Sequence, residues 1–272
     1  MSLLKFFSTA PLVLVFSFYL IGCADSPEEE VADPENVEAT ETPETEEVEE
    51  EVEMVAESPA EEGPLNTSSW LPAFEVGEVL IFRFTHSFGD NEELAERYGE
   101  PYLVRQTVER WENVNDEEFL LVMRSEEDGP DGFLEAHSRF LINAEGMFLI
   151  EEGLVDGGGA FYVPGSLLLP GELPETESVF HQTEIIEQID GQEVMLEDSR
   201  ELRFAGREDI EIGAGVFADC LRIEGQVETV SGDRVQTFSF TEWFAPGLGL
   251  VKGEWTTEGE KFAFELESFS IE

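Results

Sequence analysis

The side chains best suited to nucleophilic or metal chemistry are few and widely spaced in this sequence. Its three histidines, His86, His137 and His181, occur on separate predicted strands, outside any HExxH motif or i, i+4 pair. Gly157–Gly159 has neither the lysine nor the helix of a phosphate-binding loop. No GxSxG motif exists, so Ser166 lacks the turn that presents a hydrolase serine. A sheet could bring two histidines together as metal ligands, but solvated strand positions are favoured, and we expect a flexible loop at the glycines.

Acidic side chains are so abundant that no pair of them is informative. The chain has 63 Asp and Glu against 14 Lys and Arg, a formal net charge of −49. A glycosidase needs two carboxylates at a set distance across a cleft, and chance alone would supply such a pair here. Asp128 and Asp131 lie in a turn that could bind Ca²⁺ weakly, but it lacks the EF-hand pattern and a plain tight turn is favoured. We expect no catalytic residue, no metal site and no cofactor.

Cys220 and the aromatic residues near the C-terminus favour structural roles. A lone thiol in the middle of a buried strand behaves as a small hydrophobe, whereas a catalytic thiol would need a nearby cation or histidine. Trp243, Phe244 and Trp255 flank a glycine-rich hairpin turn. They could form a platform for a ligand, but we favour rings that seal the sheet.

Composition excludes several classes of protein. So few basic residues cannot form a patch for nucleic-acid phosphates in this excess of carboxylate, and repulsion disfavours docking on anionic lipid by charge. Two cysteines cannot build a disulfide scaffold. With 41% hydrophobic residues, the chain is not wholly disordered. An acid-rich, lysine-poor chain is typical of proteins in a high-salt medium; a calcium-loaded surface is the alternative.

The first 23 residues have the pattern of a secretion signal that ends in a cysteine. Lys5 precedes the apolar run 11–21, which suits a signal peptide and is too short to span a bilayer. The closing residues 20–23, LIGC, resemble the bacterial lipobox. That resemblance implies cleavage of a signal peptide at residues 1–22, attachment of acyl chains such as palmitate at Cys23, and a stable membrane anchor. An ordinary signal peptide with a chance cysteine is the alternative.

Residues 23–63 are predicted to be a lipidated cysteine and a disordered acidic tether. Positions 24–63 hold 18 Asp or Glu, with no Lys, Arg or aromatic residue, and four prolines interrupt any helix. Such a segment cannot bury enough apolar surface to offset its chain entropy. We favour a self-repelling spacer over a specific acidic recruitment tail.

From residue 64 to residue 272 the hydrophobic pattern has a period of two. Turn residues separate the apolar segments, and the Asp190-Gly191 pair is the strongest hairpin signal. Only 91–98 has a helical pattern. We therefore predict one all-β domain, an antiparallel meander of about nine to eleven strands that forms a curved half-barrel, barrel or sandwich. The expected strands are 79–87, 102–113, 119–124, 133–142, 147–151, 178–189, 192–204, 216–230, 234–245, 250–257 and 261–271.

The segment 206–255 resembles the TapB-like group of exported β-rich domains of unknown function. That group shows a glycine and alanine turn before a strand that often carries a cysteine, and then a W-[YF]-A-P-G-[VL]-G-L-V-K motif. Gly213 departs from the group, which usually has proline there. The resemblance implies an all-β envelope domain attached to lipoproteins and implies no activity. The matching residues are Gly206, Ala214, Gly215, Phe217, Cys220, Trp243, Phe244, Ala245, Pro246, Gly247, Gly249, Leu250, Val251 and Lys252.

These patterns together favour a non-enzymatic lipoprotein of the cell envelope. Ala24 after the anchor cysteine favours the outer membrane in a host with two membranes. We expect the domain to bind an apolar ligand or an envelope protein, in a groove covered by a loop at 153–175. The alternative is a hydrolase that acts on envelope polymer through paired carboxylates; a pure spacer or assembly factor is a third class. A hydrolase requires a polar cleft and an acid whose pKa is raised, whereas a lipid binder requires an apolar cavity without acids.

Overall fold

The computed structural model describes residues 64–272, apart from residues 90, 130, 131, 156, 190, 191, 258 and 272. The predicted signal peptide, Cys23 and the acidic tether lie outside the described residues and stay predictions. Asp131 and the Asp190-Gly191 pair also lie outside the described residues, so the choice between a tight turn and a calcium site at Asp131 is not tested.

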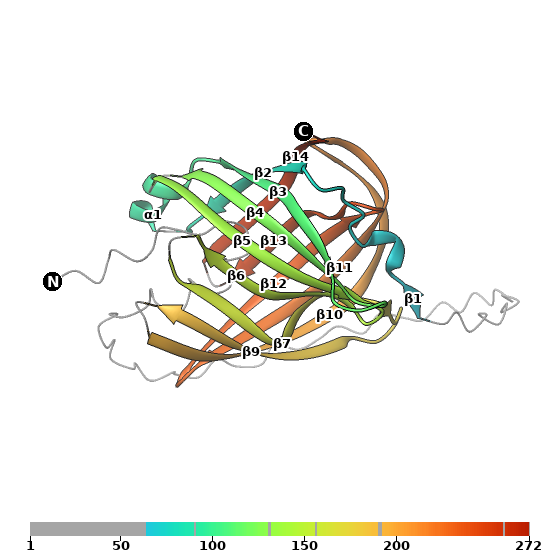
Figure 1. The fold of residues 1–272 in the computed structure, drawn as a ribbon. Helices are drawn as coiled ribbons and strands as arrows, with labels where there is room; N and C mark the ends of the chain where they lie inside the picture. The colour runs from blue at the N-terminus through green and yellow to red at the C-terminus, as the bar shows by residue number, and fades with distance from the viewer. Residues whose placement is uncertain are drawn as a thin grey trace, which may run out of the picture. The chain divides into compact units, whose positions relative to one another are not determined.

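Twelve antiparallel strands form a closed barrel (Figure 1). Sequence neighbours pair around the wall, and β14 pairs with β2 to close it. The predicted all-β meander is confirmed, and of the three forms considered the barrel is the one adopted. The strands are β2 (Glu78–Ser87), β3 (Tyr102–Asn113), β4 (Phe119–Gly129), β5 (Gly132–Asn143), β6 (Gly146–Leu154), β7 (Gly159–Pro170), β9 (Val179–Ile189), β10 (Gln192–Ile212), β11 (Gly215–Ser231), β12 (Arg234–Ala245), β13 (Gly249–Thr257) and β14 (Glu260–Ile271).

Strand β7 corrects one expectation. The segment 153–175 is not a covering loop, because most of it forms β7 in the barrel wall and β8 (Glu172–Leu173). The flexible glycine loop shrinks to a short connection, since Gly159 already begins β7. Pro164 and Gly165 hide the strand pattern, and the pairing of β7 with β6 is interrupted at residues 162–165. This strand accounts for the difference between eleven expected segments and twelve barrel strands.

Alternation along the strands divides the wall into an inner and an outer face. Leu80, Phe82 and Phe84 of β2 are buried, and the residues between them are partly or fully exposed. Phe84 packs against the rings of Phe262 and Phe264, with ring centres 5.4 and 5.6 Å away. The interior is therefore a phenylalanine-rich core.

A segment before β2 packs over one end of the barrel (Figure 1). It contains β1 (Leu65–Asn66), which pairs with β8, and the short helix η3 (Ser68–Trp70). Trp70 is buried, and its indole nitrogen donates to the Asp219 carbonyl at 2.9 Å. Helix α1 (Glu92–Tyr98) lies between β2 and β3 in the chain. We call residues 64–77 the end segment. Pro72 and Phe74 of this segment line the interior cavity.

Candidate functional site: the interior cavity

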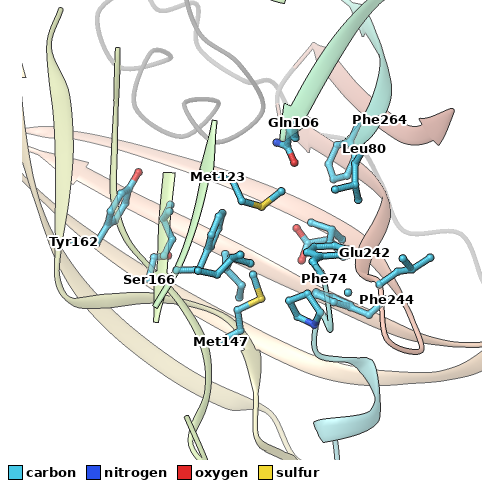
Figure 2. A pocket seen from close by; sticks show the side chains of 18 of the residues that line it. Phe74, Leu80, Gln106, Met123, Met147, Tyr162, Ser166, Glu242, Phe244 and Phe264 are labelled. Carbon is cyan, nitrogen blue, oxygen red and sulfur yellow. The ribbon is translucent and has the colours of Figure 1, made fainter. Parts of the chain in front are cut away.

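An interior cavity of about 110 Å³ lies within the barrel (Figure 2). Its wall is mainly hydrocarbon, because it is built from the inward positions of the strands and from the end segment. Figure 2 shows Met123, Met147 and Glu242 directed toward the same space. The wall residues are Pro72, Phe74, Leu80, Gln106, Leu121, Met123, Phe140, Met147, Leu149, Tyr162, Ser166, Leu168, Asp198, Arg200, Glu242, Phe244, Leu248, Gly249, Leu250, Trp255, Phe262 and Phe264.

A buried ion pair forms one polar part of this wall. Arg200 Nη2 lies 3.9 Å from Glu242 Oε1, and the two residues are 2% and 3% exposed. Arg200 Nη1 donates to the Leu167 carbonyl at 2.7 Å. The guanidinium carbon lies 4.9 Å from the centre of the Phe240 ring and 5.5 Å from that of Trp255, within the range of a cation–π contact. The cation is therefore held by a carboxylate, a carbonyl and two rings.

Burial controls the charge of the acids in the wall. Loss of water raises the pKa of Glu242 to about 7, although Arg200 opposes this shift. Burial also raises the pKa of Asp198, which accepts a hydrogen bond from Thr229 Oγ1 at 2.8 Å. No described residue donates a hydrogen bond to Glu242 Oε2.

A second group of buried acids lies elsewhere in the interior. Burial raises the pKa of Glu152 well above its usual value, and the negative charge of Glu187 raises it further. Tyr162 Oη donates to Glu152 Oε1. Neither acid lines the cavity, although Tyr162 does.

The three histidines are placed apart, and each has a local environment of its own. His86 packs against Phe88 and Phe262, and burial lowers its pKa to about 4. His137 Nε2 lies 3.4 Å from Glu151 Oε1, and His181 Nε2 lies 2.6 Å from the Gly165 carbonyl. Among the described residues, no group of three or more His, Cys, Asp or Glu side chains is placed to hold a metal ion. The expectation of a solvated position is wrong for His86, because its side chain lies on the face of β2 that packs against the core.

Other residues singled out from the sequence divide between core and cavity. Cys220 is fully buried, as expected, and burial raises its pKa to about 11. Ser166, Phe244 and Trp255 line the cavity. Trp243 is buried, does not line the cavity, and donates from its indole nitrogen to Glu208 at 2.6 Å.

Sequence reasoning missed Arg200 and Glu242. Both stand at inward phases of their strands, since Glu242 follows Phe238 and Phe240 at the same period of two. A charged residue on the same strand face as two buried phenylalanines could have predicted a buried charge. It was overlooked because acids are so frequent in this chain.

The cavity meets only part of each expectation for its function. Its hydrocarbon wall is what we expected of a lipid binder. Glu242 and Asp198, with raised pKa values, are what we expected of a hydrolase.

The helices were also compared with the length and apolarity that a membrane span requires. Among the described residues, no helix meets both requirements.

Comparison with known proteins places the fold rather than the activity. A family model described as DUF3108-like matches residues 167–263, a range that includes the segment 206–255. A crystal structure of a protein from Parabacteroides distasonis, provisionally described as a lipoprotein, has 13% identity and a TM-score of 0.50, over 74% of this chain and 98% of that one. A search of curated proteins finds no match.

Two further solved structures are similar at lower scores. One is an exported protein with a YmcC-like fold from Bacteroides fragilis, also described provisionally, with 13% identity and a TM-score of 0.47 over 73% of this chain and 98% of that one. The other is the hypothetical lipoprotein YmcC from Escherichia coli, with 13% identity and a TM-score of 0.36 over 74% of this chain and 86% of that one.

Proposed function

We propose that this protein is a non-enzymatic envelope lipoprotein whose barrel binds an apolar ligand. The observation that carries the proposal is the interior cavity, whose wall is hydrocarbon over most of its area. Burial of an apolar group there contributes about 0.8 kcal/mol for each CH₂. Kinship with the TapB-like exported domains belongs to the same proposal, and it rests on the motif residues of the segment 206–255.

The size of the cavity limits what enters it. A volume of about 110 Å³ is smaller than the ~150 Å³ cavity that holds benzene in another protein. A cavity of this size therefore takes the end of a chain rather than a whole acyl group. Met123 and Met147 line it, and their unbranched side chains can move to admit more.

A pair of methionine variants tests the ligand site. Met147→Trp fills the cavity and should weaken binding of 1-octanol to the full chain by about tenfold or more, as measured by titration calorimetry. Met195→Trp makes the same change on the outer face, where Met195 is 64% exposed, and should leave binding unchanged. Equal effects of the two substitutions would show that the cavity is not the site.

The alternative function is hydrolysis of envelope polymer by a buried acid. Glu242 favours it, because a carboxyl with a pKa of about 7 is suited to general acid catalysis. The hydrocarbon wall opposes it, since a glycan needs many polar partners. Turnover of a glycan or ester that Glu242→Gln abolishes would replace the binding proposal. If no apolar probe binds and no turnover occurs, an envelope protein is the remaining partner.

Anchoring is the part of the proposal that depends on Cys23. Cys23→Ser should release the protein from membranes, or leave its N-terminus uncleaved, because the sulfur that carries lipid is gone. Cys220→Ser is the matched control, since Cys220 is buried in the barrel and should not affect anchoring. Detergent partitioning and N-terminal mass provide the readout, and sorting to the outer membrane is the outcome that Ala24 favours. A Cys23→Ser protein that partitions and is processed like the unaltered chain would refute the anchor.

A further inference from the structure

The guanidinium of Arg200 already has partners within the protein. Its Nη2 lies 3.9 Å from Glu242 Oε1, and its Nη1 donates to the Leu167 carbonyl. Asp198 lines the same cavity, so two carboxyl groups face one guanidinium. A ligand with a carboxylate end would bring a third acid to this single cation, at a high cost in a low-dielectric interior.

Glu242 Oε2 is a buried acceptor in the same wall. No described residue donates a hydrogen bond to it, and Glu242 is 3% exposed. Its carboxylate is directed into the space between the labelled methionines and phenylalanines in Figure 2. A buried acceptor without a donor costs free energy, and a bound O–H group recovers that cost without adding charge.

The hydrocarbon around this acceptor determines the rest of the ligand. Leu80, Met123, Met147 and Phe244 line the cavity together with Glu242. Carbons next to a donor at Oε2 would therefore contact aliphatic and aromatic side chains. A wholly polar ligand such as a sugar would leave most of its own donors and acceptors unpaired there.

Resting on the proposed apolar-ligand function, we propose that the ligand is an uncharged hydrocarbon chain that ends in a hydroxyl group and donates from this hydroxyl to Glu242 Oε2. The class is that of long-chain alcohols rather than fatty acids. The hydroxyl-bearing end occupies the cavity beside Glu242, and the remainder of the chain displaces the methionine side chains.

Three probes of equal chain length separate donor recognition from apolar burial. They are 1-octanol, which donates and is uncharged; methyl octanoate, which only accepts; and octanoate, which is an anion. Titration calorimetry is done at about pH 9, where Glu242 is ionised and its Oε2 can only accept a hydrogen bond. The full chain carries Cys23→Ser, which avoids competition from an attached lipid. We expect 1-octanol to bind about tenfold more tightly than either other probe, which is 1.4 kcal/mol. This ranking is measured without any change to the cavity.

Variants of the acceptor extend the test. Glu242→Gln keeps the size of the side chain and adds a donor, so the advantage of 1-octanol over methyl octanoate should fall to about threefold or less. Glu127→Gln is the matched control, because Glu127 is a buried acid that does not line the cavity. If Glu242→Gln does not fold, the double variant Arg200→Met, Glu242→Leu removes both charges and should abolish the advantage of 1-octanol over methyl octanoate.

The outcomes separate the inference from the function on which it rests. Equal binding of the three probes refutes hydroxyl recognition and leaves the apolar site intact. Tightest binding of octanoate also refutes it and assigns anion recognition to Arg200. A failure of all three probes to bind rejects the proposed function, and the inference with it.

Discussion

Glu242 is the residue at which burial and charge oppose each other most directly. Its carboxyl lies among phenylalanines and has one cationic neighbour at 3.9 Å. Loss of hydration is the larger effect, and it raises the pKa of this group from 4.5 to about 7. The charge state of the cavity wall therefore changes near neutral pH.

This shift predicts a pH dependence of stability. Between pH 4.5 and about 7 the folded protein holds a proton on Glu242 that the unfolded chain releases. The free energy of unfolding should therefore fall as pH rises through this window, by about 3 kcal/mol at 1.36 kcal/mol for each pKa unit. Urea unfolding of the unaltered chain and of Glu242→Gln, at several pH values, measures the difference in slope.

The substitution isolates Glu242 from the other buried acids, because those titrate in both proteins. Glu117→Gln, at an exposed turn, is the control and should leave the slope unchanged. Parallel curves for the unaltered chain and Glu242→Gln would contradict the assignment.

Among the elements, β7 departs most from regular strand geometry. Gly165 has a φ of 143°, a conformation that side chains with a Cβ rarely adopt. Its carbonyl accepts hydrogen bonds from Thr183 Oγ1 and faces His181 Nε2, each at 2.6 Å, so the bulge joins β7 to β9 beyond the regular ladder. The bulge lets β7 continue past Pro164 and return to β6 as far as Pro170.

The crowding around Gly165 predicts an unequal cost for two similar substitutions. In Gly165→Ala the new Cβ would lie 3.1 Å from the Phe148 Cβ, in addition to the backbone strain. Gly232→Ala, at a turn with φ of 58°, meets nothing within 4 Å and carries only the strain. We expect the first to cost about 2–3 kcal/mol and the second about 1 kcal/mol.

Denaturant unfolding of both variants measures these costs. Equal losses of unfolding free energy would show that β6 can move away from the new Cβ at little cost, and that the bulge is not tightly packed.

On the scale of the whole molecule, like charge opposes compactness. Residues 64–272 carry 45 acidic and 13 basic side chains, a net charge of −32. Ion pairs such as Arg83 with Glu267 and Arg203 with Glu224, each at 2.6 Å, offset little of this excess because they are partly exposed. The remaining acids repel one another across the outer wall.

Salt should therefore stabilise the protein. The thermal midpoint of the full chain is expected to rise by several degrees from millimolar to molar NaCl, since 1 kcal/mol corresponds to about 2–4 °C at this size. A flat or falling series would remove the high-salt interpretation. A steep rise with millimolar CaCl₂, but not with NaCl of matched ionic strength, would favour bound calcium instead.

The alternating pattern of the sequence was sufficient to predict an antiparallel all-β domain and the inward face of most strands. Leu80, Phe82 and Phe84 show why: the side chains of a strand alternate whatever lies around it, so phase can be read locally. The strand β7 escaped prediction because Pro164 and Gly165 interrupt that phase. Lipid attachment at Cys23 and the stabilisation by salt remain predictions from the sequence.

Closure of the barrel and the composition of its cavity were decided only by the tertiary structure. The pairing of β14 with β2 depends on the tilt and register summed around the whole wall, which no local segment contains. Arg200 and Glu242 stand on β10 and β12, separated by β11, and meet only because the curved wall turns both inward. Burial then raises the pKa of Glu242, a property that depends on surrounding residues from many strands and that its own segment cannot reveal.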